Sequence, residues 1–370
     1  MIPSSLRYIV AGVSAPGAIV VLALASAALI TGCGGGGDAS TSTTSSTTSD
    51  SSSSSGTPLR AANAQDVVSP LYPSCDFVWF SAQDPNGAAK LLITWQTASS
   101  QMPSIAINVT KPNGSYANLS TVVSAPVVRT GLPSISAEPV DSSADRIDFR
   151  WVPSESAYHL TFTAAGMSGN LWFRNNQVGA AMQPVQWDQQ QVFWSSSIGR
   201  TDIDGSIQFV GDAQATTVTG WQGEEERMAG SFSLDPGHVG YEYAQTSNPD
   251  GSADQLFVFP QISGGNWRGL LAHVEKSGEL TYCEPDVVQL ANYQKTAEGY
   301  VYPGTVHAKC TARNLDLTYT VSTPQDFPLG PPGLATNSYP AYTSMSAGSS
   351  NVTGSVGTIQ HLRDLGYYGS

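Results

Sequence analysis

Residues 270–283 read LLAHVEKSGELTYC, and this stretch carries the pattern that decides the fold. Two short apolar segments, 270–274 and 280–283, flank the turn signal Lys276-Ser277-Gly278. Glycine supplies the positive φ that a tight hairpin needs, while β-branched and aromatic residues favour extended chain. The stretch therefore predicts two antiparallel strands joined by a tight turn.

The same pattern recurs from residue 75 to the end of the chain. Short segments with alternating or continuous apolar character lie between Gly, Asn, Asp and Pro turn signals at 91–95, 105–109, 159–163 and 315–321. Ile203-Asp204-Gly205-Ser206 is interpreted as a further tight hairpin turn. A short helix is an alternative only at 223–228. So many strands with one apolar face favour barrels or sandwiches, so we expect an all-β protein.

Composition narrows the class of protein further. Hydrophobic residues make up 40% of the 370 residues, and charged residues make up 12%. The 36 glycines and 23 prolines disfavour long helices and coiled coils. A net charge of -13 leaves no basic surface for phosphate groups, so we expect no nucleic-acid partner.

The N-terminus has the features of an export signal. Arg7 precedes a long apolar run that ends in Leu29-Ile30-Thr31-Gly32-Cys33, which resembles a bacterial lipobox. This interpretation makes residues 1–32 a signal peptide and Cys33 the acylated residue that binds the lipid bilayer. Gly34, rather than Asp, follows the cysteine, which favours the outer membrane of a bacterial envelope. An uncleaved membrane anchor with an incidental cysteine is the alternative.

The remaining chain divides into a tether and two folded units. Residues 33–60 are rich in Gly, Ser and Thr and are expected to form a disordered tether. A weak internal repeat, in which Phe80 and Leu91-Leu92 match Phe259 and Leu270-Leu271, supports two units. We expect them at 70–248 and 252–370, because Asn248-Pro249-Asp250-Gly251 is a turn-rich boundary.

Three cysteines lie in the folded part. Cys75, Cys283 and Cys310 would face an oxidising compartment, so one disulfide is expected. Cys283 with Cys310 is favoured because the two lie on successive expected strands. Cys75 with either partner is the alternative.

Several segments together resemble the tandem lipocalin-like (calycin) family related to AttH and carotenoid 1,2-hydratase. They are Phe193-Trp194-Ser195, 218–225 (VTGWQGEE), Trp267-Arg268-Gly269-Leu270-Leu271, Tyr302-Pro303-Gly304 and Leu365-Gly366-Tyr367. The resemblance implies two lipocalin-like antiparallel β-barrel domains with an apolar cavity. Its reactive segment is similar to an aromatic residue, any residue, Asp and His. Trp221 fits the aromatic position, while Gly223 and Glu224 stand at the positions of Asp and His.

Glu224 and Glu225 are the candidate catalytic residues. Adding water to an alkene needs an acid in dry surroundings, and neighbouring carboxyl groups raise each other's pKa. The alternative is a solvated acidic turn paired with Arg227. Five aromatic residues are the candidates for binding an apolar ligand, although they also suit a filled core: Trp194, Trp221, Tyr241, Tyr243 and Trp267.

The sequence offers little for other chemistry. The five histidines have no His-x-His or His-x-x-x-His spacing, so we expect no metal site. No Gly-x-Gly-x-x-Gly or P-loop motif is present, and we expect no cofactor. The leading hypothesis is an outer-membrane-anchored lipoprotein that binds a hydrophobic small molecule or lipid in a barrel cavity. The alternatives are a hydratase or isomerase that uses a cavity carboxylate, and a structural or adhesion lipoprotein with filled cores.

Overall fold

Thirteen ranges of the chain are described by the computed structural model. They are 57–67, 75–87, 89–99, 103–124, 126–128, 134–137, 145–187, 190–230, 241–260, 267–295, 301–328, 341–349 and 355–363. The expected signal peptide, Cys33 and most of the tether lie outside these ranges. In the part that is described, no helix has both the length and the hydrophobicity needed to cross a membrane.

The described chain is almost entirely strand, as expected. Its few helical turns are the short 3-10 segments η2 (Ala64–Val67), η3 (Pro153–Glu155) and η4 (Thr311–Arg313). In the described residues the strands pair antiparallel, and tight turns such as Asp84–Gly87 and Glu275–Gly278 join several successive strands. The hairpin at residues 270–283 forms as predicted, with Leu271 opposite Cys283.

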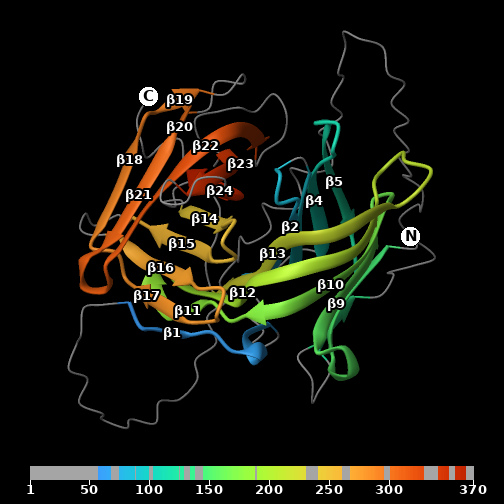
Figure 1. The fold of residues 1–370 in the computed structure, drawn as a ribbon, viewed down its shortest axis with the longest axis horizontal. Helices are drawn as coiled ribbons and strands as arrows, with labels where there is room; N and C mark the ends of the chain where they lie inside the picture. The colour runs from blue at the N-terminus through green and yellow to red at the C-terminus, as the bar shows by residue number, and fades with distance from the viewer. Residues whose placement is uncertain are drawn as a thin grey trace, which may run out of the picture.

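The N-terminal sheet curls around its own core (Figure 1). In the described residues it runs in the order β5-β4-β3-β2-β13-β12-β10-β9-β8-β7-β6, and β11 pairs with β12 and β1. The strands are β1 (Leu59–Ala61), β2 (Cys75–Gln83), β3 (Lys90–Ser99), β4 (Ser104–Thr110), β5 (Tyr116–Val122), β6 (Val127–Val128), β7 (Ser134–Ala137), β8 (Arg146–Val152), β9 (Ala157–Ala164), β10 (Met167–Gln177), β11 (Ala180–Trp187), β12 (Gln190–Gln208) and β13 (Thr216–Gly230).

The C-terminal sheet lies beside the first and runs in the order β17-β16-β15-β14-β24-β23-β22-β21-β18 (Figure 1). Its strands are β14 (Glu242–Ser247), β15 (Ala253–Phe259), β16 (Arg268–Val274), β17 (Leu280–Cys283), β18 (Val287–Ala291), β21 (Thr305–Cys310), β22 (Leu315–Pro328), β23 (Ala341–Ser349) and β24 (Val356–Arg363). Two short strands, β19 (Gln294–Lys295) and β20 (Val301–Tyr302), pair separately.

In the part of the chain that the structure describes, buried apolar side chains form three cores. The N-terminal core fills the first curled sheet, where the ring centroids of Phe80 and Phe149 lie 4.7 Å apart. The C-terminal core includes Leu256, Tyr302 and Tyr319. The inter-sheet core joins side chains of β2, β12 and β13 to side chains of β14, β15 and β16. The two sheets are therefore packed face to face through the third core.

Two local expectations differ from the structure. Asp204 and Gly205 lie inside β12, not in a hairpin turn, because β12 continues to Gln208 with a register shift at Gly205. A Cβ atom on Gly205 would lie 2.0 Å from the Asn170 carbonyl oxygen, so this glycine permits a bulge where two strands approach closely. Residues 223–228 are strand rather than helix, because β13 pairs with β12 on one side and β2 on the other.

The change from one sheet to the other falls earlier than the expected boundary. Residues Asn248–Gly251 form the turn between β14 and β15, where the Gly251 amide donates to the Asn248 carbonyl. Since β14 pairs with both β15 and β24, it belongs to the C-terminal sheet. The second unit therefore begins before Glu242.

A segment at the end of the expected tether is part of the folded body. Residues 57–67, which we name the N-terminal strap, contact both sheets. β1 pairs with β11, while the Thr57 amide donates to Glu284 Oε2 over 2.8 Å. Glu284 also pairs with Arg268 at 2.7 Å. Leu59 packs against the inter-sheet core, so the strap covers one edge of the contact between the sheets.

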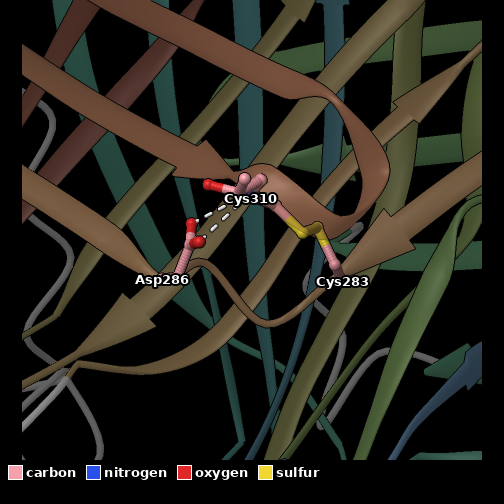
Figure 2. Close-up of a disulfide and its surroundings, with 4 residues drawn as sticks. Cys283, Asp286 and Cys310 are labelled. Atoms are coloured by element: carbon pink, nitrogen blue, oxygen red, sulfur yellow. Dashed lines mark hydrogen bonds between the residues drawn. A yellow bond between two sulfur atoms is a disulfide. The ribbon is translucent and has the colours of Figure 1, made fainter.

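Cys283 and Cys310, the favoured pair, form a disulfide (Figure 2). It joins the end of β17 to the end of β21, and the Cα atoms lie 6.5 Å apart. Beside it, the carboxylate of Asp286 accepts hydrogen bonds from the Thr311 amide at 3.1 and 3.3 Å. The bridge therefore fastens two strands that the sheet order separates.

Replacing both cysteines with serine should lower the free energy of unfolding by about 3–4 kcal/mol, because the bridge closes a loop with a sequence separation of 27. Urea denaturation of the wild type and of the Cys283→Ser/Cys310→Ser variant measures the difference. Peptide mapping without reductant should recover the Cys283–Cys310 cross-link. A cross-link through Cys75, or equal stabilities, would contradict the expectation.

Candidate functional site

Three consecutive glutamates of β13, Glu224 to Glu226, point alternately toward two different cores. Trp221 belongs to the N-terminal core, while Met228 belongs to the inter-sheet core. Because successive side chains of a strand point to opposite faces, Glu224 and Glu226 share the face of Met228. Glu225 points to the other face, where the hydroxyl of Ser197 donates to its carboxylate. The inter-sheet side therefore receives two of the three glutamates.

Glu224 is buried and held by two side chains of the C-terminal sheet. It is 1% exposed. The Tyr243 hydroxyl donates to its Oε1 atom, and Gln255 Nε2 donates to its Oε2 atom over 3.3 Å. Burial raises the pKa of Glu224 to about 8, although the two hydrogen bonds act in the opposite direction. This carboxyl group is therefore largely protonated at neutral pH.

Glu226 lies two residues further along the same face and is also 1% exposed. Burial raises its pKa well above the usual range, and the nearby charge of Glu224 adds to the effect. Tyr243 and Trp194 act in the opposite direction. Among the described residues, its Oε2 atom has no hydrogen-bond partner. Glu226 is therefore an acid with a raised pKa, and one of its oxygens is available to a bound molecule.

Aromatic rings surround these two acids. Trp79 lies directly opposite Glu226 in the β2–β13 pairing and stacks on Phe77 with centroids 5.6 Å apart. Trp194 stacks on Phe257 at 5.6 Å with an interplanar angle of 4°. Tyr241 contacts the same phenylalanine ring at 5.3 Å. The acids therefore lie in apolar, aromatic surroundings, which is the physical cause of their raised pKa.

Buried polar atoms without partners gather between the sheets. Native proteins leave few such atoms, so a concentration of them indicates a place where water or a ligand is bound. Within the described ranges, the atoms on this face without a hydrogen-bond partner are Trp79 Nε1, Ser81 Oγ, Gln96 Nε2, Glu226 Oε2, Gln245 Oε1, Gln255 Oε1, Thr358 Oγ1 and Gln360 Nε2, and Trp194 lies beside them against Glu226. We call the region formed by these residues with Glu224, Tyr241 and Tyr243 the inter-sheet site.

The structure brings together only part of the predicted set. Glu224, Trp194, Tyr241 and Tyr243 meet in the inter-sheet site. Trp221 packs in the N-terminal core, and Trp267 packs against the C-terminal core. These two tryptophans therefore line other parts of the molecule.

Glu225 is equally buried but belongs to the opposite face of β13. It is 0% exposed, and burial raises its pKa to about 8. On the same strand, Arg227 forms a buried ion pair with Asp76, and its Nη1 group donates to the Asp66 carbonyl over 3.2 Å. Glu226 and Trp79 were not among the predicted residues. The alternation of β13 would have indicated Glu226, since it is two residues from Glu224.

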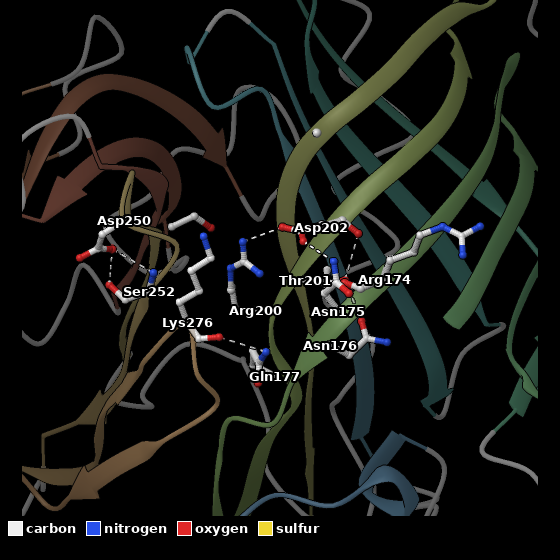
Figure 3. A network of polar contacts seen from close by, with 12 residues as sticks. Arg174, Asn175, Asn176, Gln177, Arg200, Thr201, Asp202, Asp250, Ser252 and Lys276 are labelled. Carbon is white, nitrogen blue, oxygen red and sulfur yellow. Dashed lines mark hydrogen bonds and ion pairs between the residues drawn. The ribbon is translucent and has the colours of Figure 1, made fainter. Parts of the chain in front are cut away.

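Polar contacts at the rim hold the two sheets together (Figure 3). Gln177 Nε2 donates to the Lys276 carbonyl over 3.3 Å, which joins β10 to the β16–β17 turn. Nearby, Arg200 pairs with Asp202 at 2.6 Å. A Cβ atom on Gly199 would lie 2.6 Å from the Gly179 Cα atom, so small residues permit the close approach of chain segments here. The rim thus fixes the position of Gln255 above Ser196, to which it donates over 2.7 Å.

The described residues contain no group of three or more His, Cys, Asp or Glu side chains suited to holding a metal ion. The inter-sheet site is instead made of acids, amides, hydroxyls and aromatic rings. Such a set can transfer protons and bind apolar molecules with a few polar groups.

Comparison with known proteins bears on the fold. AttH from Nitrosomonas europaea superposes with a TM-score of 0.53 at 15% identity, over 79% of this chain and 93% of that one. Kievitone hydratase from Nectria haematococca superposes with a TM-score of 0.54 at 10% identity, over 82% of this chain and 95% of that one. CghA superposes with a TM-score of 0.51 at 11% identity, over 83% of this chain and 94% of that one.

This chain has the lipocalin-like fold that these three structures share. The resemblance predicted from the sequence is thus confirmed for the fold. No protein-family model matches the chain, and no curated protein matches it. Since the identities are 10–15%, the likeness describes architecture, and any activity must be argued from the site itself.

The buried acids predict that stability falls as pH rises. Glu224 has a pKa of about 8 in the folded chain against 4.5 in the unfolded chain, so the folded state binds more protons between these values. Stability should therefore decrease from about pH 5 to pH 8. Glu224→Gln should remove part of this loss, about 2–4 kcal/mol, since a neutral amide does not titrate.

Urea denaturation across this pH range measures the effect. The exposed Glu279 is a suitable control, and Glu279→Gln should keep the wild-type slope. If Glu224→Gln also kept the wild-type slope, Glu224 would not be protonated in the folded protein.

Proposed function

We propose that this protein binds an unsaturated hydrophobic small molecule between its two sheets and transfers a proton to it, as a hydratase or isomerase does. The observation that carries the proposal is the pair Glu224 and Glu226, joined through Tyr243 and buried among aromatic rings. An acid that stays protonated at neutral pH in apolar surroundings is what alkene protonation requires. The shared fold of kievitone hydratase supports this class of reaction over simple binding.

Glu226 is the proton donor in this proposal. Its Oε2 atom has no partner among the described residues, while both oxygens of Glu224 accept hydrogen bonds. The O–H bond of Glu226 breaks as a C–H bond forms at one carbon of the alkene, and the other carbon becomes a cation. The faces of Trp79 and Trp194 stabilise positive charge through their ring electrons.

Two outcomes complete the reaction with the same residues. Water adds to the cation and returns a proton to the Glu226 carboxylate, which gives an alcohol. Alternatively, a neighbouring C–H bond loses its proton to the carboxylate, which gives an isomer. Glu224 and Tyr243 act as positioning residues, because the Tyr243 hydroxyl bonds to Glu224 and also interacts with Glu226, which orients the pair.

Deuterium incorporation tests proton transfer directly. The protein is incubated in D₂O with farnesol, geranylgeraniol or squalene, and product and recovered alkene are examined by mass spectrometry. Wild type should incorporate carbon-bound deuterium, and Glu226→Gln should reduce the rate by about 100-fold or more, since a positioned general acid contributes 10²–10⁴-fold.

Glu225→Gln is the matched control. It removes an equally buried carboxyl group from the same strand on the opposite face, so the rate should change little. Binding of these compounds without deuterium incorporation would contradict catalysis and favour a carrier. Equal rates for Glu225→Gln and Glu226→Gln would contradict the role of Glu226.

We further propose that the protein is attached to the outer membrane of a bacterial envelope through acylated Cys33. The lipobox-like stretch 29–33 and the Ser- and Thr-rich segment that follows support this location. The N-terminal strap then connects the attached end of the chain to the edge of the inter-sheet site, since Leu59 packs on that core. A hydrophobic substrate would thus be handled close to a lipid surface.

Metabolic labelling with a radioactive fatty acid tests the attachment. Wild type should carry label and sediment with outer membranes, whereas Cys33→Ser should lose the label and be released from the membrane fraction. Membrane-bound, labelled Cys33→Ser protein would contradict acylation at this residue.

A further inference from the structure

Four side chains of the inter-sheet site form a compact polar surface at one end of it. They are Ser81 of β2, Gln245 of β14, and Thr358 and Gln360 of β24; we name them the amide patch. Gln245 lies directly opposite Thr358, and Tyr243 lies directly opposite Gln360. Because paired residues in an antiparallel sheet share a face, Gln245, Thr358 and Gln360 all face the N-terminal sheet with Tyr243.

Ser81 reaches the same place from the opposite sheet. It is paired with Glu224 on β13, and the Tyr243 hydroxyl donates to Glu224. Two residues along β2, Gln83 Nε2 donates to Ser247 Oγ over 3.4 Å and to the Val356 carbonyl over 2.9 Å. The sheets are therefore joined on both sides of Ser81, with the amide patch between the two points of contact.

Each member of the amide patch is buried and has a polar atom without a partner in the described part of the chain. Gln245 offers a carbonyl oxygen, Gln360 an amide nitrogen, and Ser81 and Thr358 a hydroxyl group each. Their exposed fractions are 3% or less. Leaving such atoms unpaired costs about 1–3 kcal/mol each, so the set favours a bound group that both donates and accepts hydrogen bonds.

The surrounding charges favour an uncharged group. Glu224 is adjacent, and Lys90 is close to β24, since its amino group donates to the Gly357 carbonyl over 3.1 Å. Burial lowers the pKa of Lys90 to about 7, so its charge is already weakened. An anion would lose its hydration on entering this buried region, which is costly. A hydroxyl group meets the donor and acceptor requirements without that cost.

We propose that the amide patch selects substrates that carry a neutral hydroxyl group at one end of an apolar body. The proposal rests on the proposed function, because the amide patch would bind the polar end of the same molecule whose alkene meets Glu226. Across the C-terminal sheet the same face changes from Leu270 and Ala272 on β16 to Gln360 and Thr358 on β24. An amphipathic molecule matches this change in polarity along its length.

Three matched compounds test the proposal by calorimetry on the folded, full-length mature protein. They are 3-(2-naphthyl)propan-1-ol, 2-propylnaphthalene and 3-(2-naphthyl)propanoate, which differ only in the end group. Wild type should bind the alcohol at least about 5-fold more tightly than the hydrocarbon, which is the effect of one net hydrogen bond. The carboxylate should bind more weakly than the alcohol.

The variant Gln245→Met/Gln360→Met removes the two amides with little change of volume. This variant should bind the alcohol no more tightly than the hydrocarbon, and its affinity for the hydrocarbon should equal or exceed that of wild type. Gln208→Met is the matched control, since Gln208 is a half-buried glutamine at the end of β12 that lies outside the inter-sheet site, where its Nε2 atom donates to the Asp212 carbonyl over 3.1 Å. It should keep the wild-type preference.

A melting temperature measured without ligand separates binding from a structural role. Because each of the two amides buries one polar atom without a partner in the described chain, the melting temperature of Gln245→Met/Gln360→Met should be equal to or above that of wild type. A lower melting temperature with an unchanged alcohol preference would overturn the proposal, as would equal binding of alcohol and hydrocarbon by wild type.

These outcomes are independent of the catalytic test. Equal binding of alcohol and hydrocarbon, with deuterium transfer still dependent on Glu226, would reject the amide patch alone. Failure of all three compounds to bind would reject the patch together with the binding part of the proposed function. Loss of deuterium transfer with a preserved alcohol preference would reject the catalytic part only.

Discussion

The packing of two sheets face to face over carboxyl groups is the constraint on which this structure depends. β13 lies in the middle of the N-terminal sheet, paired on both sides, and its residues 223–230 are buried. Glu224 and Glu226 are consequently pressed against β14 and β15, and a charged carboxylate there would lose its hydration. Protonation avoids that cost, and Tyr243 and Gln255 supply hydrogen bonds in place of water. The fold thereby produces neutral acids at neutral pH.

The same strand separates two kinds of buried polar chemistry. On the inter-sheet face, acids stand beside aromatic rings and unpaired amides, which suits a bound molecule. On the other face, Arg227 and Asp76 form a buried ion pair that also involves the N-terminal strap through the Asp66 carbonyl. Breaking such a pair is costly, so that face maintains the fold while the first face remains available for function. One strand therefore couples the integrity of the structure to the geometry of the site.

Much of the fold could be predicted from the sequence because it depends on local patterns. The hairpin at 270–283, the strands at 91–95 and 105–109, and the Cys283–Cys310 bridge follow from alternation, turn residues and proximity of strands. The predicted turn at Gly205 is wrong, because an Asp-Gly pair indicates a turn except where neighbouring strands require a bulge. That requirement is visible only when β10, β12 and β13 are side by side.

The site could be predicted only in part, because it is made by contacts between distant segments. Glu224, Trp194 and Tyr243 were predicted from a family resemblance and from acidic crowding, and they do meet. Whether Glu225 or Glu226 joins them depends on which face of β13 each side chain occupies. The sequence alone leaves this open, because a helix is an alternative at 223–228. Trp79 and Gln360 come from strands far away in the chain, and no local motif marks them as partners.

The most direct test of this account is the titration of the glutamate carboxyl carbons by NMR, using protein labelled at those carbons. The account predicts that the Glu224 signal stays protonated up to about pH 8, that the Glu226 signal titrates well above the ordinary range, and that each signal disappears in the matching Glu224→Gln or Glu226→Gln protein. If every glutamate in the folded protein titrated near its ordinary pKa, the two sheets would not enclose neutral acids, and the account would be contradicted.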